Sequence, residues 1–223
     1  MAIAYGLAKY SNQNPSGNSQ TLLGVTCTNG TDKGLFIVVT MPNGVNFSSA
    51  TYNGTAMTAI GNQNYGSAAQ RQCGFWLANP DSGSQYNFVV NFSGGQWGGP
   101  TSIMAQSFTG ISQTTTTNHA SNGLVTTPHT VSITIAANDI IYMSGISGSA
   151  QAYNYEIPTG TAVTNAFAHN TNKQVEGAWS GLSLSAGATN ISTRANSNTI
   201  TNHRWAFGSA GGGGGGRRRI IIL

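Results

Sequence analysis

Short apolar runs alternate with polar, turn-forming segments along most of the chain. The runs are rich in Val, Ile, Phe, Tyr and Thr, the residue types that fit a pleated, half-buried strand. The segments between them contain Asn-Gly, Gly-Gly and Pro, which supply the positive or fixed φ angles that tight turns need. The pattern therefore predicts strands over residues 21–28, 35–40, 74–78, 86–92, 102–109, 130–135 and 140–145, and a closing strand over residues 204–207.

This spacing of strands and turns is typical of a β-sandwich. No window of about twelve residues keeps an apolar period of 3.6 with capping residues at both ends, so we expect almost no helix. The expected fold is all-β: a jelly-roll-like or Ig-like antiparallel β-sandwich over residues 1–210, with an extended C-terminal tail over residues 211–223. Residues 112–119 and 151–172 are the longest loop candidates. The pattern leaves open whether a small additional layer comes after Ser112.

The composition predicts an almost uncharged surface. Only 6% of the residues are charged, against about 25% in an ordinary globular protein. Three of the nine Lys and Arg residues are Arg217, Arg218 and Arg219, and the others are scattered. Because phosphate binding requires clustered cations, we expect no nucleic-acid partner. The chain has no apolar stretch of membrane-spanning length and no basic, apolar leader, so we also expect no membrane partner and no export signal.

Few residues are suited to catalysis. Of the five carboxylates, Asp32, Asp81 and Asp139 stand in turn contexts. Glu156 and Glu176 remain as a pair for glycoside cleavage, which needs two carboxylates about 5 to 10 Å apart, but nothing in the sequence brings them together. We therefore expect no enzymatic activity and no catalytic residue. A polysaccharide depolymerase that uses these two glutamates is the weakest alternative.

The histidines and cysteines predict no metal site and no cofactor. Cys27 and Cys73 form one disulfide if their strands are adjacent, but isolated cysteines in apolar runs are more often buried free thiols. The histidines lack the spacing of a compact metal site, and we expect them on the surface or in loops. They are His119, His129, His169 and His203.

The tryptophans divide by sequence context. Trp76 and Trp205 stand in apolar strands, and we expect both in the core. Trp97 stands in a glycine-rich loop, where it either folds back over the end of a sheet or stacks on a sugar or a partner protein. Tyr153 and Tyr155 allow the same two interpretations. The alternative function is therefore a glycan-binding receptor-recognition module that stacks sugars on Trp97, Tyr153 and Tyr155.

The C-terminal sequence predicts an anchor. Residues 211–216 are glycines, which neither nucleate a helix nor hold a strand without outside support. A cationic triplet and four apolar residues come next, and such a segment suits an apolar groove or the edge of a sheet. The predicted partner-binding residues are Arg217, Arg218, Arg219, Ile220, Ile221, Ile222 and Leu223.

Four segments carry a resemblance to a known family. They are Ser-Ala-Thr-Tyr-Asn-Gly-Thr-Ala-Met-Thr at residues 49–58, Phe-Trp-Leu-Ala-Asn-Pro-Asp-Ser-Gly at 75–83, Asn-Phe-Val-Val-Asn-Phe-Ser-Gly at 87–94 and Gln-Ser-Phe-Thr-Gly-Ile at 106–111. Together they resemble a recurrent pattern of β-rich proteins of tailed bacteriophages and of bacterial surface repeats. The match covers about half of the chain, and residues 112–202 match only loosely.

The resemblance implies a sandwich displayed on a virion or a cell surface, and it offers no catalytic residues. Bacterial surface repeats commonly follow an export signal, so the phage setting is favoured. The resemblance thus implies a structural virion component, such as a capsid decoration, head-fibre or tail surface protein, that is assembled in the host cytoplasm. The expected partners are other virion proteins and copies of the chain itself, as a homo-oligomer with a trimer as one option. Host surface glycans are the partner under the alternative function.

Overall fold

The computed structural model describes residues 2–13, 17–42, 45–63, 70–93, 101–113, 119–125, 129–147, 153–156, 163–169, 175–180, 186–195 and 200–210. For residues 153–156, 163–169 and 175–180, and for most of residues 120–131 and 188–203, only the backbone is described. No residue within the described ranges is helical, which confirms the expected all-β class.

The strands fall into two series along the chain. The first series is β1 (Ala4–Gln13), β2 (Ser19–Thr26), β3 (Gly34–Pro42), β4 (Asn46–Tyr52), β5 (Thr55–Ala56), β6 (Thr58–Gln63), β7 (Gln70–Ala78), β8 (Gln85–Ser93) and β9 (Thr101–Thr109). The second is β10 (His119–Val125), β11 (His129–Ile135), β12 (Ile140–Ser147), β13 (Tyr153–Glu156), β14 (Val163–His169), β15 (Val175–Ser180), β16 (Gly187–Ala195) and β17 (Ile200–Phe207).

The strands that the apolar pattern predicts are confirmed as β2, β3, β7, β8, β9, β11, β12 and β17. The prediction of a loop over residues 151–172 is wrong in part, because β13 and β14 lie there. β13 pairs with β16, and β14 pairs with β15. These two strands form through hydrogen bonds to their neighbours, although their sequences lack the apolar alternation by which a strand is predicted.

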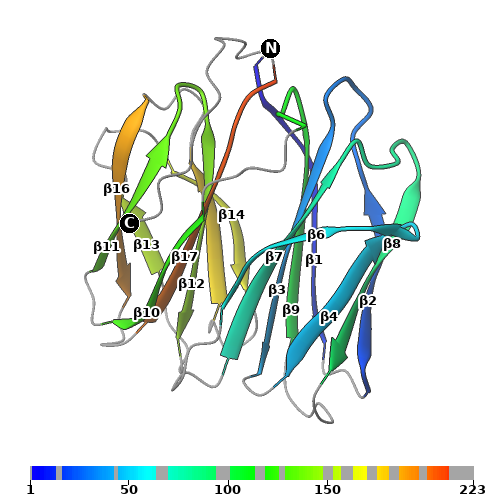
Figure 1. Cartoon of the computed structure of the whole chain (residues 1–223), viewed down its shortest axis with the longest axis horizontal. Coiled ribbons are helices and arrows are strands. Elements are labelled where there is room, and N and C mark those ends of the chain that lie inside the picture. Colours follow the sequence, from blue (N-terminus) through cyan, green and yellow to red (C-terminus); the bar gives the residue numbers. More distant parts are fainter. Residues whose placement is uncertain are drawn as a thin grey trace.

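The strands form four antiparallel sheets stacked as successive layers (Figure 1). The first outer sheet has the order β2-β8-β4-β5, and the first inner sheet has the order β1-β9-β3-β7-β6. The second inner sheet has the order β10-β17-β12-β15-β14, and the second outer sheet has the order β11-β16-β13. The chain after Ser112 thus forms a second pair of sheets rather than a small additional layer.

The second pair of sheets repeats the strand order of the first. If β10–β13 are matched with β1–β4 and β14–β17 with β6–β9, the two inner sheets have the same order. The two outer sheets also agree, except that the two-residue β5 has no counterpart among the described residues. The first sandwich has nine described strands and the second has eight. A jelly roll likewise divides eight strands between two antiparallel sheets. The chain therefore contains two jelly-roll-like sandwiches of the same topology, packed through their inner sheets.

Strand β3 shows why the inner sheets have continuous apolar runs. Its sequence is Gly-Leu-Phe-Ile-Val-Val-Thr-Met-Pro, and residues 34–41 are all buried. Successive side chains of a strand point to opposite faces, so Leu35 and Ile37 face the first outer sheet while Phe36 and Val38 face the second inner sheet. In β8, on the outer sheet, buried and partly exposed residues alternate because one face meets solvent.

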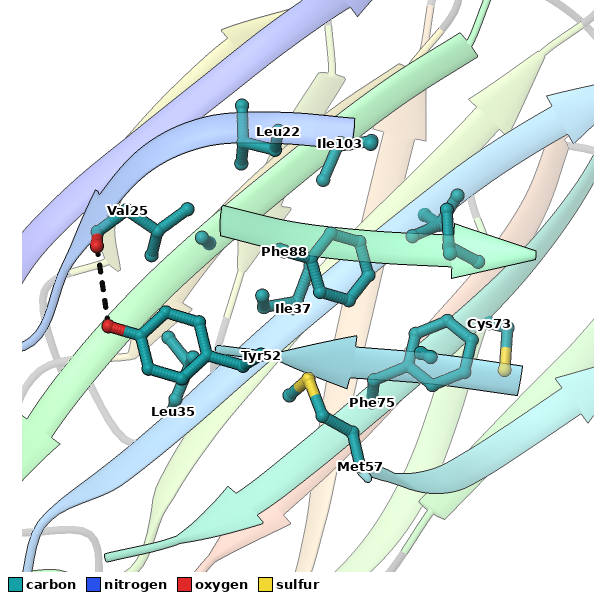
Figure 2. Packing of buried hydrophobic residues seen from close by; sticks show 14 of the residues in the cluster. Leu22, Val25, Leu35, Ile37, Tyr52, Met57, Cys73, Phe75, Phe88 and Ile103 are labelled. Atoms are coloured by element: carbon teal, nitrogen blue, oxygen red, sulfur yellow. Dashed lines mark hydrogen bonds between the residues drawn. The ribbon is translucent and has the colours of Figure 1, made fainter. Parts of the chain in front are cut away.

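Two apolar layers carry most of the described core. The first layer lies between the first outer and first inner sheets (Figure 2) and includes Leu22, Leu35, Tyr52, Phe75 and Phe88. The interface layer lies between the two inner sheets and joins residues of both sandwiches. Its buried members are Ile3, Phe36, Val38, Trp76, Met104, Phe108, Ile111, Ile140, Tyr142, Trp205 and Phe207.

Candidate interaction surface

Three large apolar side chains are exposed among the residues whose side chains the structure describes. Leu7 is 60% exposed, Tyr10 is 55% exposed and Leu23 is 62% exposed. Leu7 and Tyr10 lie on β1, and Leu23 lies on β2. Each of these strands is the terminal strand of its sheet within the described residues. Tyr10 pairs with Met104 of the interface layer, whereas Leu23 follows Leu22 of the first layer, so these two side chains point to opposite sides of the sandwich.

One side-chain hydrogen bond joins β1 to β2, although the two strands belong to different sheets. The Lys9 ammonium donates to the Gly24 carbonyl oxygen at 3.0 Å. The Leu7 N–H donates to Thr28 Oγ1, just after the end of β2, at 3.3 Å. The Ser107 hydroxyl of β9 donates to the Leu7 carbonyl oxygen at 3.1 Å.

Both edge strands are irregular near Leu7 and Leu23. The register of β1 shifts between Tyr5 and Ala8, and that of β2 shifts between Leu22 and Val25. Gly24 has φ +65°, a conformation that glycine adopts without the steric penalty of a side chain. Such bulges re-aim side chains at sheet edges. Leu7 and Leu23 stand within these two irregular stretches and are directed outward.

The motifs of the family resemblance meet in one network of turns. The Tyr52 hydroxyl donates to the Asp81 carbonyl oxygen at 3.2 Å, and its second contact is the Val25 carbonyl oxygen at 3.3 Å (Figure 2). Asn53 Nδ2 donates to Asp81 Oδ2 at 2.7 Å. Asn53 has φ +47° and Gly54 has φ +77°. The Tyr-Asn-Gly and Asn-Pro-Asp-Ser-Gly motifs therefore have a structural role here, because they fix the ends of strands.

A buried polar contact links the two sandwiches. Gln72 is fully buried, and its Nε2 donates to Thr40 Oγ1 at 3.0 Å and to Ser144 Oγ at 2.8 Å. Thr40 and Gln72 belong to the first inner sheet, whereas Ser144 belongs to the second. Because a buried amide loses stability without partners, this contact favours one alignment of the two inner sheets.

The second contact between the sandwiches involves a histidine that the sequence places on the surface or in a loop. His119 instead begins β10 and stacks on Trp205 with ring centroids 5.2 Å apart. Its ring also lies against Gly61 of β6, so closely that a Cβ at position 61 would be 2.5 Å from the His119 Nε2. Burial lowers the pKa of His119 to about 4. The Trp205 indole N–H donates to the Ile60 carbonyl oxygen at 3.2 Å.

Several predicted site residues lie outside the described residues or the described side chains. Trp97 and residues 211–223 are outside the described ranges. Tyr153 and Tyr155 lie on β13, opposite Ala195 and Thr193, but only their backbone is described. The glycan-stacking alternative therefore stays a prediction.

The two glutamates of the depolymerase alternative lie on strands of different sheets. Glu156 pairs with Ser192 in the second outer sheet, and Glu176 pairs with Gly145 in the second inner sheet. Their side chains are not among those described. Within the described residues no group of three or more His, Cys, Asp or Glu is arranged to hold a metal ion.

Other sequence predictions are confirmed. Trp76 and Trp205 are buried, as expected. Cys27 and Cys73, for which the sequence left pairing open, are buried free thiols. Burial raises the pKa of the Cys73 thiol to about 12. Asp139 stabilises its turn by accepting the Ala136 N–H at 2.7 Å.

The exposure of Leu7, Tyr10 and Leu23 was not predicted from the sequence, although β2 contains one signal for it. Leu22 and Leu23 are adjacent, and adjacent side chains of a strand point to opposite faces. Since Leu22 faces the first layer, Leu23 must face solvent or a partner. Leu7 and Tyr10 carry no such signal, because β1 has a mixed composition.

Comparisons with protein-family models, with curated proteins and with solved structures found no match to this chain. Within the described residues, no helix has the length and apolar character to cross a membrane.

Proposed function

We propose that this chain is a structural, non-catalytic component of a tailed-bacteriophage virion, displayed on the capsid or tail and anchored to neighbouring subunits by residues 211–223. The observation that carries the proposal is the sequence of that segment. Six glycines, three arginines and four apolar residues come directly after Ala210, which lies at the end of the described fold.

The position of Ala210 supports an anchor role for the C-terminal tail. The Ala210 N–H donates to the Gly110 carbonyl oxygen at 2.8 Å, and Ser209 forms a bridge with Ile111. The chain is thus fastened to the first sandwich at the point where the glycines begin. Because this attachment point is fixed to the sandwich, an anchored tail would hold the sandwich close to the subunit that it binds.

The family resemblance supports the virion setting. Its motifs supply the turn network around Tyr52 and Asp81, and they supply Phe108 of the interface layer. Motifs that fix strand ends and sheet packing support a structural role rather than a catalytic one. The low content of charged residues also suits a densely packed particle surface, where neighbouring copies face each other at short distance.

The physical chemistry of the tail suits cooperative attachment. Six glycines extend at most about 20 Å, enough to cross from one subunit into the next. Each apolar side chain that becomes buried stabilises the contact by about 1.5 to 3 kcal/mol. Ordering the glycines costs about 1 to 2 kcal/mol per residue, which offsets much of this gain. Repeated copies on a particle strengthen the attachment through avidity.

Deletion of residues 217–223 tests the proposal. We expect the deleted chain to fold with the same circular dichroism spectrum and to lose about 90% of its occupancy on purified particles, because removing the buried apolar side chains removes most of the binding free energy. Occupancy is measured by quantitative mass spectrometry against the major capsid protein.

A matched control separates apolar anchoring from charge. A full-length chain in which Ile220, Ile221 and Ile222 are replaced by Ser retains the arginines and the tail length. We expect it to be released like the deletion. Full occupancy of the deleted chain on particles would show that the anchor function is wrong.

A further inference from the structure

We propose that the two sandwiches are copies of one unit related by an approximate twofold axis, and that their inner-sheet faces bind each other as independent partners, without the covalent connection between β9 and β10. The partner of each face is therefore a sandwich of the same kind, from the same chain or from a second copy. This inference goes beyond the proposed virion role and does not depend on it.

The two inner sheets agree in register as well as in strand order. Phe36 of β3 pairs with Trp76 of β7, and Tyr142 of β12 pairs with Trp179 of β15. Each tryptophan is the last residue of a Gly-x-Trp sequence. In both sheets the glycine of this sequence pairs with the residue two positions further along the central strand. The two halves of the chain are therefore equivalent residue by residue at this place.

The turns before the central strands are also equivalent. Asp32 has φ +50° and Asn138 has φ +64°. Positive φ is uncommon for residues other than glycine. Asp32 stands four residues before Phe36, and Asn138 stands four residues before Tyr142. An uncommon backbone conformation thus recurs at the same position of both sandwiches, as expected for copies of one unit.

Equivalent rings contact each other across the interface layer. Phe108 of β9 pairs with the residue two positions before Phe36, and Phe207 of β17 pairs with the residue two positions before Tyr142. The centroids of Phe36 and Tyr142 lie 5.6 Å apart, and those of Phe108 and Phe207 lie 6.1 Å apart. In a twofold interface the same patch serves both partners, so equivalent residues near the axis meet. These two ring pairs therefore mark the axis.

The contacts between different strands are reciprocal. Phe36 of β3 lies 5.4 Å from Trp205 of β17, measured between ring centroids. In the opposite sense, the Tyr142 hydroxyl of β12 donates to Met104 Sδ of β9 at 3.3 Å. Because β3 is equivalent to β12 and β9 to β17, each contact is the counterpart of the other. Such reciprocity is the property of an interface between two like subunits.

The segments that follow β9 and β17 pair with each other as well. Ile111 forms an antiparallel bridge with Ser209, and the Ser112 N–H donates to the Gly208 carbonyl oxygen at 2.7 Å. Equivalent segments that are related by a translation run parallel, whereas a twofold axis can make them antiparallel. This pairing therefore agrees with the axis that the ring pairs mark.

Each sandwich has a core of its own besides the interface layer. In the first sandwich Leu35 and Phe88 belong to the first layer, between the inner and outer sheets. In the second, Ile133 of β11, Ile141 of β12 and Ile191 of β16 are buried. Ile141 is adjacent to Tyr142 and so points away from the interface layer, toward its own outer sheet. The two sandwiches can therefore part at the interface layer without losing the layers within them.

The first test cuts the full chain after it has folded. A recognition sequence for a site-specific protease is inserted between Thr116 and Thr117, in the connection between the sandwiches. After cleavage, we expect the two fragments to remain a one-to-one pair, with the circular dichroism spectrum and the size-exclusion volume of the uncut chain. Fragments that separate or aggregate after cleavage would contradict the inference, because faces that bind as partners need no covalent connection.

The second test asks whether the halves exchange between copies. Cleaved protein is mixed with isotope-labelled cleaved protein, and native mass spectrometry follows the pairs that contain one labelled half. We expect these mixed pairs to reach their statistical proportion. A mixture that keeps only its original pairs would show that the two sandwiches form one inseparable fold, and the inference would be wrong.

Matched variants of the cleaved protein assign the exchange to the interface layer. Phe36→Leu reduces a ring of the interface layer, and Phe88→Leu reduces a ring of the first layer. We expect Phe36→Leu to speed the exchange about tenfold, as the loss of one interface anchor does. Phe88→Leu should leave its rate unchanged. Equal acceleration by both variants would show that exchange requires unfolding of a sandwich, which would overturn the inference. None of these measurements involves particles, so the anchor function is tested separately.

Discussion

The two apolar layers of this protein differ in composition and in the parts that they join. The first layer packs two sheets of one sandwich and is mainly aliphatic and sulfur-containing. The interface layer joins two sandwiches and is dominated by aromatic rings, six of its eleven buried residues: Phe36, Trp76, Phe108, Tyr142, Trp205 and Phe207. Phe36 contacts three rings of the second sandwich, those of Tyr142, Trp205 and Phe207.

This difference in composition shows how two similar sandwiches are held together. Aliphatic side chains fill the narrow space within a sandwich at high density. Aromatic rings provide large contact areas and preferred tilted or edge-on geometries, as they do in protein interfaces. The hydrogen bond from Gln72 to Ser144 also favours one alignment of the two inner sheets. The interface layer thus resembles a subunit interface that lies within one chain.

The largest expected effect comes from truncating a ring in each layer. Phe36→Ala and Phe88→Ala each remove a fully packed ring and should each destabilise the fold by about 3 to 5 kcal/mol. Phe36 bridges the sandwiches and Phe88 lies within one of them, so the loss of Phe36 also weakens the coupling between the sandwiches. We expect differential scanning calorimetry to show two resolved transitions for Phe36→Ala and one shifted transition for Phe88→Ala. A single transition in both variants, with equal calorimetric and van't Hoff enthalpies, would contradict the coupling role.

A smaller loss of stability is expected when the pH falls, and it arises at the His119 contact between the sandwiches. The pKa of His119 is about 4 in the folded chain, below the value of about 6.5 in an unfolded chain. The unfolded state therefore binds a proton first as the pH falls, and stability is lost between about pH 6.5 and about pH 4. We expect this residue to account for a loss of roughly 1 to 3 kcal/mol.

Urea unfolding of the parent chain and of His119→Gln, measured at several values between neutral pH and the folded-state pKa, isolates this contribution. The carboxylates titrate in both proteins, so the difference between them belongs to His119. The parent chain should lose its advantage over the variant as the pH falls. A difference that is the same at every pH would show that the His119 contact does not respond to protonation.

The smallest effects on stability are expected from removing side-chain hydrogen bonds, one set across the interface layer and one set within the first sandwich. Gln72→Met removes the bonds to Thr40 and Ser144 across the interface layer, and Tyr52→Phe removes the hydroxyl from the turn network of the first sandwich. Each change should cost about 0.5 to 1.5 kcal/mol. We expect amide hydrogen exchange to speed up in both inner sheets for Gln72→Met, but only near residues 79–83 for Tyr52→Phe. The reverse assignment would contradict the roles given to these residues.

The strands that the sequence predicts are those with a strong apolar signal. β3 and β12 read as continuous apolar runs because both faces of each inner sheet are buried, and β8 alternates because one face is exposed. β13 and β16 are polar, and their strand character comes from pairing with neighbours. The repeated topology could not be predicted from the local pattern of residues, because strand order depends on long-range pairing.

The candidate site was less predictable than the fold. The tail stands out in the sequence because its composition is extreme, whereas the exposed apolar residues are ordinary leucines and a tyrosine. Leu7, Tyr10 and Leu23 are exposed on β1 and β2, the terminal strands of their sheets within the described residues. The place of a strand in its sheet depends on long-range pairing and cannot be read from that strand alone.

The most direct test of the proposed anchor is the position of residues 220–223 in the native assembly. Electron cryomicroscopy of purified particles, at a resolution that shows side chains, would identify every residue within contact distance of Ile220 and Leu223. The anchor function predicts that they are buried against a neighbouring subunit of the particle, with the glycines crossing between the two chains. If every assembled copy instead keeps these residues on its own sandwich, the tail does not attach the protein and the proposed function is wrong.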